Sequence, residues 1–145
     1  MFIGSSVEQL AVARAINLGL DHDPIDLVPW ASKTFRPSHY TVPELLRQVQ
    51  RCDFAIFCMG PDDVVTSRST SSPVTRDNVL FEAGLFMGAL GHERVFLVRP
   101  RGVDLKVPSD LNGFNFIDYK LTGADPDVDA ACEELRRAIR DGKPK

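Results

Sequence analysis

Six consecutive apolar residues, Phe54 to Met59, constrain the fold of this chain more than any other segment. A strand with one face in water alternates apolar and polar side chains, whereas a strand covered on both faces is apolar throughout. Strands of the second kind belong mainly to parallel sheets whose two faces are covered by helices. The run therefore predicts an α/β protein built around a parallel sheet.

Strand and helix signals alternate along the rest of the chain. Further strands are expected at residues 2–4, 25–28, 95–98 and 114–117, the last of them at a sheet edge because its apolar residues alternate. Helices are expected at about 5–20, 41–49, 78–90 and 128–140, with loops at 31–40 and 60–76. This alternation, with right-handed crossovers, predicts a flavodoxin-like three-layer sandwich with a five-stranded, mainly parallel sheet.

Length and composition are typical of one globular domain, residues 1–145. No apolar run reaches the roughly 18 residues of a membrane span, and a net charge of -3 offers no basic footprint for nucleic acid. The three histidines are too scattered for a metal site. The three cysteines form no C-x-x-C pair and are expected as free thiols. Together with the lack of a signal peptide after Met1, they predict a cytoplasmic protein.

One carboxylate lies within an otherwise apolar helical segment, residues 78–90. Glu82 is the only ionisable side chain there, and burial would raise its pKa, which is typical of functional carboxylates. From the pattern alone an equally good interpretation is that Glu82 pairs with Arg76 or Arg94 and only stabilises the fold.

Ligands of open parallel sheets bind beyond the carboxyl ends of the strands, and the first predicted strand is followed there by small polar residues. Gly4, Ser5 and Ser6 could present backbone N–H groups to a phosphate. The alternative is simple capping of the next helix, with a capping box offered either by Ser5 and Glu8 or by Ser6 and Gln9. The segment lacks the spacing of a dinucleotide fingerprint or a P-loop.

Two other groups of residues are candidates for the same edge of the sheet. Asp62 and Asp63 could hold ribose hydroxyls or a metal, although a solvated turn is the default interpretation. Trp30 and Phe35 could stack on a base, although a single Trp more often belongs to a core.

Several motifs together point to a known family. They are Phe-Ile-Gly-Ser-Ser at 2–6, Asp-Phe-Ala-Ile-Phe at 53–57, Pro-Asp-Asp-Val-Val at 61–65 and, most specifically, Arg-Asp-Asn-Val-Leu-Phe-Glu at 76–82 with Gly-Leu-Phe-Met-Gly at 84–88. The chain resembles the bacterial TIR-like family, the effector domains of the cyclic-nucleotide-triggered antiphage systems CBASS and Pycsar, including those fused to a STING domain. The resemblance extends nearly over the whole chain, to Val-Pro-Ser-Asp-Leu at 107–111.

The resemblance implies a TIR fold and an NAD+ glycohydrolase, for which NAD+ is the substrate and neither a cofactor nor a metal is expected. It also implies that Glu82 is catalytic. One carboxylate beside the ribose is sufficient, because cationic nicotinamide leaves as a neutral molecule and needs no general acid, unlike the leaving group of an ordinary glycosidase. The residues that it places around the ligand are Gly4, Ser5, Ser6, Trp30, Phe35, Asp62, Asp63, Arg76 and Asn78.

The resemblance further implies self-association, because TIR domains typically act when stacked head to tail. Candidate contact surfaces are the loop 31–40 and the helix end 85–90, near which Gly84 and Gly88 suggest close packing of another surface. A cyclic-nucleotide sensor is implied as well, so we expect residues 1–145 to be a catalytic module excised from a longer chain with a C-terminal sensor domain, or awaiting a separate partner. Two alternatives stay open: a nucleoside deoxyribosyltransferase-like enzyme and a non-catalytic TIR–TIR scaffold.

Overall fold

The structure is a computed structural model, and it describes residues 1–25, 42–111, 113–114 and 116–142. The strands are β1 (Phe2–Ser5), β2 (Ala55–Cys58), β3 (Asp63–Ser67), β4 (Thr70–Val74), β5 (Val95–Pro100), β6 (Phe116–Thr122) and β7 (Asp125–Asp127). The helices are α1 (Leu10–Gly19), α2 (Val42–Arg51), α3 (Asp77–Leu90) and α4 (Asp129–Asp141), with short 3-10 turns at His92–Arg94 and Ser109–Leu111.

A five-stranded sheet in the order β1-β2-β5-β6-β7 forms the centre of the domain. The pairs β1–β2, β2–β5 and β5–β6 are parallel, and β7 pairs antiparallel with β6. This confirms the predicted mainly parallel α/β sandwich. The expected edge position of the last parallel strand is wrong, because β7 extends the sheet by pairing with the second half of β6. Of the predicted strand at 25–28, Ile25 is not in a strand and the rest lies outside the described residues.

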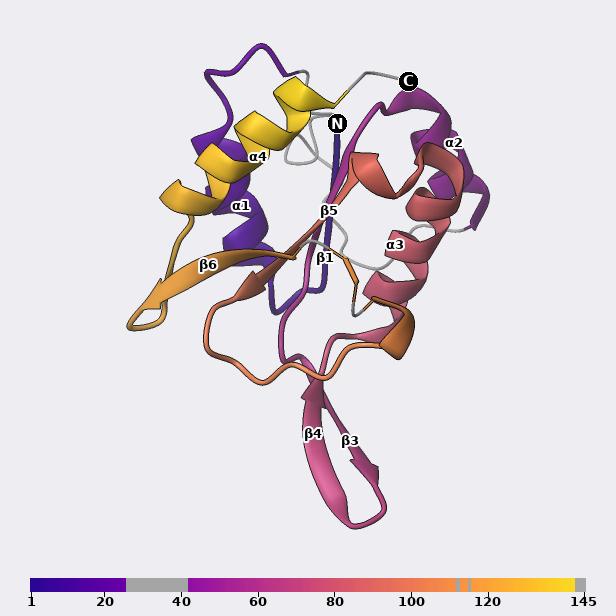
Figure 1. Ribbon diagram of the computed structural model, residues 1–145, viewed down its shortest axis with the longest axis vertical. Helices are drawn as coiled ribbons and strands as arrows, with labels where there is room; N and C mark the ends of the chain where they lie inside the picture. Colours follow the sequence, from indigo (N-terminus) through magenta and orange to yellow (C-terminus); the bar gives the residue numbers. More distant parts are fainter. Residues whose placement is uncertain (26–41, 112, 115, 143–145) are drawn as a thin grey trace.

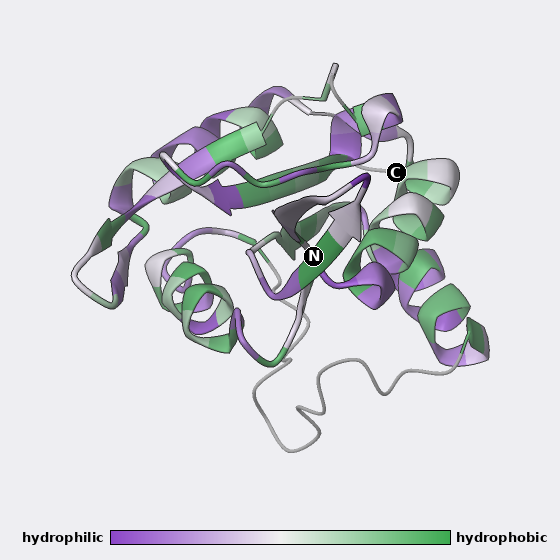
Figure 2. Cartoon of the chain, turned by 90° about the horizontal axis from the view of Figure 1, so that it is seen from below, coloured by the Kyte–Doolittle hydropathy of each residue, from purple (hydrophilic) through white to green (hydrophobic). Residues whose placement is uncertain are grey.

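The apolar run at 54–59 is buried on both faces, as its sequence predicts. Ile56 and Cys58 face a core cluster shared with α1 and α4, whereas Ala55 and Phe57 face a second cluster shared with α2 and α3. Figure 1 shows the two helix pairs on opposite sides of the strands, and Figure 2 shows strongly hydrophobic stretches along the strands between them. Alternate side chains of one strand therefore serve two separate cores.

Residues 60–76 do not form the expected loop. Most of this segment is the antiparallel hairpin β3–β4, which projects from the body of the domain (Figure 1). Every residue of β3 is exposed, and the two turn residues, Arg68 and Ser69, have positive φ of 49° and 67°. Positive φ at both central residues is the geometry that matches a two-residue turn to the twist of a hairpin.

The three cysteines are free and buried, which confirms the expectation of unpaired thiols. Burial raises the pKa of the Cys58 thiol to about 12, with a smaller contribution from the charge of Asp62. Within the described ranges, no helix combines the length and the apolar character that crossing a bilayer requires.

Candidate active site

The candidate site is formed where β1 and β2 end and α3 begins. In a parallel sheet the carboxyl ends of neighbouring strands meet at one edge. Here β1 ends at Ser5, the parallel β2 ends at Cys58, and the hairpin that follows β2 leads back to the start of α3 at Asp77. The predicted site residues on these segments therefore belong to the same edge of the sheet.

Glu82 lies on the second turn of α3 and is 6% exposed. Its neighbours Val79, Ala83 and Phe86 belong to the core cluster beneath the helix. Burial raises the pKa of the Glu82 carboxyl from 4.5 to about 7, because the charged form loses hydration. Among the residues that the structure describes, none makes a hydrogen bond or an ion pair with this carboxylate.

The two arginines proposed as partners for Glu82 interact elsewhere. The Arg76 guanidinium lies 2.8 Å from the Glu8 carboxylate and 3.4 Å from that of Asp63. Arg94 donates a hydrogen bond of 3.2 Å to the carbonyl of Leu90 at the end of α3. For Arg76, the interpretation of Glu82 as one half of a structural ion pair is therefore wrong. Arg76 instead ties the base of the hairpin to the turn before α1.

Gly4, Ser5 and Ser6 lie at the end of β1 and are buried. A Cβ on Gly4 would lie 2.5 Å from the Phe57 ring, so glycine is needed there for packing between neighbouring strands. The Ser5 hydroxyl donates to the Ser6 carbonyl at 2.8 Å, and the Ser6 hydroxyl accepts the Gln9 N–H at 3.2 Å. The bond from Gln9 to Ser6 is one half of a capping box, but the box is not completed, because the Gln9 side chain bonds elsewhere. The regular helix starts later than expected, at Leu10, and has no side-chain cap.

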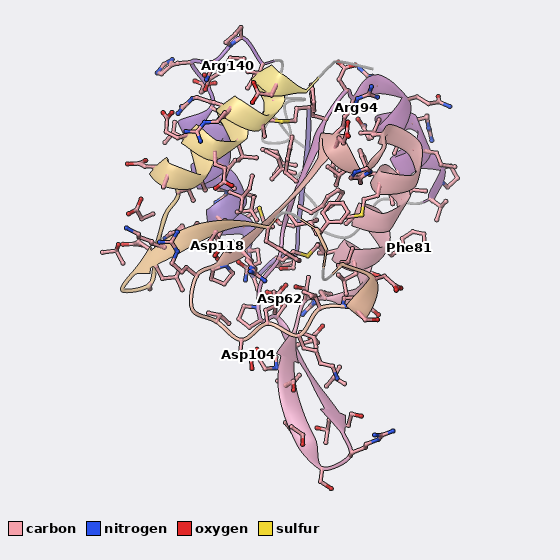
Figure 3. The ribbon with its side chains drawn as sticks, viewed as in Figure 1. Asp62, Phe81, Arg94, Asp104, Asp118 and Arg140 are labelled. Carbon is pink, nitrogen blue, oxygen red and sulfur yellow. The ribbon has the colours of Figure 1, made fainter. Side chains whose placement is uncertain are left out.

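Asp62 is bonded to Gln9, which is bonded in turn to Tyr119, and the sequence predicts neither contact. The Gln9 amide donates to one Asp62 carboxylate oxygen at 2.8 Å and accepts from the Tyr119 hydroxyl at 3.3 Å. A Cβ on Gly60 would collide with the Gln9 amide, so this glycine makes room for the bridge. The other Asp62 oxygen is buried and has no partner in the described part of the chain. Figure 3 places Asp62 at the base of the hairpin.

Of the remaining predicted site residues, two are exposed and two lie outside the described part of the chain. Asp63 begins β3 and is exposed. Asn78 is exposed one turn before Glu82, where its backbone N–H donates to the Asp77 side chain at 2.8 Å. Trp30 and Phe35 lie outside the described residues. The structure thus brings Glu82, the end of β1, Asp62, Arg76 and Asn78 to one end of the domain, and it leaves the aromatic residues untested.

The outer face of α3 is exposed and apolar. Phe81 is 55% exposed and points away from the sheet (Figure 3). Gly84 and Gly88 are also exposed, and a Cβ on either would meet nothing within 4 Å. The close packing expected over these glycines is therefore absent from the described part of this single chain.

In the part of the chain that the structure describes, no three His, Cys, Asp or Glu side chains are grouped so that they could hold a metal ion. The polar groups at the site edge are instead the carboxylates of Glu82, Asp62 and Asp63 and the guanidinium of Arg76.

Comparisons with known proteins agree with this architecture. The family model for the TIR domain of CAP12/Pycsar effector proteins matches residues 1–121. The chain is 43% identical over 149 residues to the Pycsar effector protein PaPycTIR of Pseudomonas aeruginosa. The alignment covers 100% of this chain and 48% of PaPycTIR. The chain is 44% identical over 142 residues to XpPycTIR of Xanthomonas perforans, covering 96% of this chain and 47% of the relative.

A more distant relative is CD-NTase-associated protein 12 of Sphingobacterium faecium, 34% identical over 137 residues, with 94% of this chain and 41% of the relative covered. The chain spans about half the length of the curated relatives it matches. The region matched by the family model includes β1, β2, β5 and nearly all of β6, the hairpin and the helix that carries Glu82, and it ends before β7. The chain belongs to the family of TIR domains found in CAP12/Pycsar effector proteins.

Proposed function

We propose that this TIR domain is the catalytic part of an antiphage effector that hydrolyses the bond between nicotinamide and ribose in NAD+. The observation that carries the proposal is Glu82, a buried carboxylate on α3 with no cationic partner among the described residues and a pKa of about 7. An ion-paired carboxylate would have its charge neutralised within the fold, whereas this charge is available to a cationic ligand.

The chemistry of NAD+ suits a single carboxylate. Its nicotinamide carries a positive charge and leaves as a neutral molecule, so departure needs no proton donor. The ribose develops oxocarbenium-like positive charge as the bond breaks, and ionised Glu82 would stabilise that charge or trap it covalently before water completes the hydrolysis. A cationic substrate also favours the ionised carboxylate, which offsets the effect of burial on the pKa.

Two further parts of the proposal concern activation. The names of the relatives, Pycsar effector protein and CD-NTase-associated protein, support a cyclic-nucleotide trigger that acts through a sensor on the same chain or a partner. We also propose that gathering of the domains activates cleavage. The exposed apolar face of α3 that carries Phe81 offers one surface for TIR–TIR contacts.

The test compares NAD+ cleavage by the wild type, Glu82→Gln and Glu93→Gln, each with and without enforced oligomerisation. We expect Glu82→Gln to lower the rate about 100-fold or more, because the amide cannot carry the stabilising charge. Glu93 is exposed beyond the end of α3, so Glu93→Gln is the matched control and should retain full activity.

Different results identify the alternatives. Release of a base from deoxynucleosides, with NAD+ intact, would replace the proposal with a deoxyribosyltransferase-like activity. Intact NAD+ after assembly, with wild type and Glu82→Gln indistinguishable, would leave a non-catalytic scaffold. A dilute monomer that is already fully active would refute activation by assembly. Released nicotinamide and base are measured by chromatography.

A further inference from the structure

The β3–β4 hairpin has two outer edges that differ in their capacity to pair. Residues 67 and 70 flank the two-residue turn and form a hydrogen-bonded pair, so the ladder alternates and the pair Val64–Pro73 is not hydrogen-bonded. Backbone groups of such residues point outward, away from the partner strand. The carbonyl of Pro73 does so, since it accepts the Lys106 N–H at 2.9 Å.

The β4 edge is blocked at its base, at Pro73. Pro73 has no N–H to offer at its outward-facing position, and its carbonyl is already taken by Lys106, which forms an isolated bridge with Val74. Proline and coverage by another segment are two of the ways in which proteins prevent edge-to-edge pairing.

The β3 edge has no such protection. By the same alternation, Val64 and Thr66 point both their N–H and C=O groups outward. No strand or bridge of the described part of the chain covers them, and all five residues of β3 are exposed. Val64 is 68% exposed and Val65 44% exposed, although valine is an apolar residue that favours a packed sheet.

We propose that the free edge of β3 pairs antiparallel with the same edge of a second copy of this chain, centred on Val65. The pairing is two-fold symmetric and joins the two hairpins into a four-stranded ribbon. An isolated two-stranded hairpin is marginally stable in water, and additional strands relieve that weakness. The residues that pair, Val64, Val65 and Thr66, are not among the candidate site residues and do not lie on the face of α3, and the pairing does not depend on NAD+ cleavage.

The register follows from the backbone groups that are available. Placing Val64 opposite Thr66 of the second copy, and the reverse, uses every outward N–H and C=O of both strands. Shifting the centre to Val64 would require Asp62, whose N–H is already bonded to the Gly60 carbonyl. Shifting it to Thr66 would require Arg68, which is in the turn with φ of 49°.

Side chains in this register are complementary. The two Val65 side chains are directly opposite each other in the closer, non-hydrogen-bonded type of pair, so their exposed surfaces cover one another. Arg68 at the tip of each hairpin comes near the exposed Asp63 at the base of the other, a carboxylate that also lies 3.4 Å from Arg76 of its own chain. Opposite charges therefore meet at both ends of the ribbon, which favours a second copy over an unrelated strand.

A five-residue edge buries far less than the roughly 1,200 Å² of a stable interface. The pairing is therefore weak between free copies and strengthens when another interaction holds the domains together at high local concentration.

The test is oxidative cross-linking of the purified chain with single cysteines on β3. In a directly opposed, non-hydrogen-bonded pair the Cα atoms are about 4.5 Å apart, which a disulfide spans, whereas diagonal residues exceed its reach of about 7 Å. Val65→Cys should form covalent dimers at least about tenfold faster than Val64→Cys. Val64 is the more exposed of the two positions, so random collisions would favour the opposite order. The native cysteines are buried, and the wild type should give no dimer.

A second pair of variants tests the backbone. In the Val65→Cys chain, Val64→Pro removes an outward N–H without touching a bond within the hairpin, and it should reduce dimer formation to the level of Val64→Cys. Val64→Thr keeps that N–H and should leave the dimer yield unchanged. Amide NMR shifts of β4 report whether the hairpin persists. Equal yields from Val65→Cys and Val64→Cys, or a yield unaffected by Val64→Pro, would overturn the proposal.

Discussion

The two faces of the sheet differ in whether the charged side chains on their helices have partners of opposite charge. Between α1 and α4, the Arg136 guanidinium lies 2.7 Å from the Asp23 carboxylate and 2.6 Å from that of Glu133, and it also donates to the Gly19 carbonyl. On the opposite face, Glu82 is more deeply buried and has no such partner among the described residues. The charge of Arg136 between α1 and α4 is therefore compensated within the fold, whereas the charge of Glu82 on α3 has no such compensation among the described residues and costs folding free energy.

The largest effect expected from this contrast is on the pH dependence of catalysis. Ionised Glu82 is the active form in the proposed reaction, and the ionised form predominates above its pKa of about 7. We therefore expect kcat/KM for NAD+ to rise by about tenfold per pH unit well below this pKa and to level off above it. A rate that falls as pH increases from 5 to 8 would contradict this role of Glu82. Initial rates in assembled samples provide the measurement.

A smaller effect is expected on stability. The pKa of Glu82 is raised in the folded state, so its contribution to stability is complete below pH 4.5 and is lost as pH rises through about 7. Glu82→Gln should therefore gain stability relative to the wild type between pH 5 and pH 8, by at most about 3 kcal/mol. Denaturant unfolding at both pH values measures the gain.

The control for this prediction is Glu134→Gln on the exposed side of α4, which should show no comparable change between the two pH values. If the stability difference between wild type and Glu82→Gln is the same at pH 5 and pH 8, Glu82 is not desolvated in the way the structure indicates.

The smallest effect is expected from the paired charges. Asp23→Asn should lower Tm by no more than about 4 °C, because this ion pair is still partly exposed, with side-chain exposures of 26% and 20%, and partly exposed pairs contribute about 1 kcal/mol or less and are screened by salt. The change is opposite in sign to that of Glu82→Gln at pH 8, and it should shrink at high ionic strength. If Asp23→Asn stabilised the protein, the ion pair between α1 and α4 would be as unfavourable as the unpaired Glu82, and the two helix pairs would not differ in this respect. Thermal unfolding at low and high salt tests it.

The elements with strong apolar patterns are the ones that the sequence predicts well. The run at 54–59 identifies the central strand, because burial on both faces removes every polar residue from it. The hairpin is missed for the opposite reason. It buries neither face, so no apolar alternation marks it, and its turn residues, Arg68 and Ser69, are not the glycine or asparagine that usually signal a two-residue turn.

The candidate site shows the same division. Glu82 is predictable because a single carboxylate in an apolar helix is conspicuous in the sequence alone. Gln9 and Tyr119 are not, since their contacts join residues that are 53 and 110 positions apart, and only the fold brings such residues together. The steric requirement at Gly60 could have been suspected from a glycine next to proline after a buried strand, but not its cause.

Between the end of β4 and the start of α3, the chain has only Thr75 and Arg76. Thr75 is buried, and Arg76 forms ion pairs with Glu8 and Asp63, so both residues of this connection are fixed by tertiary contacts. The base of the hairpin and the first turn of the helix that carries Glu82 are therefore held at a short, fixed separation by covalent and ionic links. A change in the direction of the hairpin would have to be absorbed within these two residues or passed on to the start of α3.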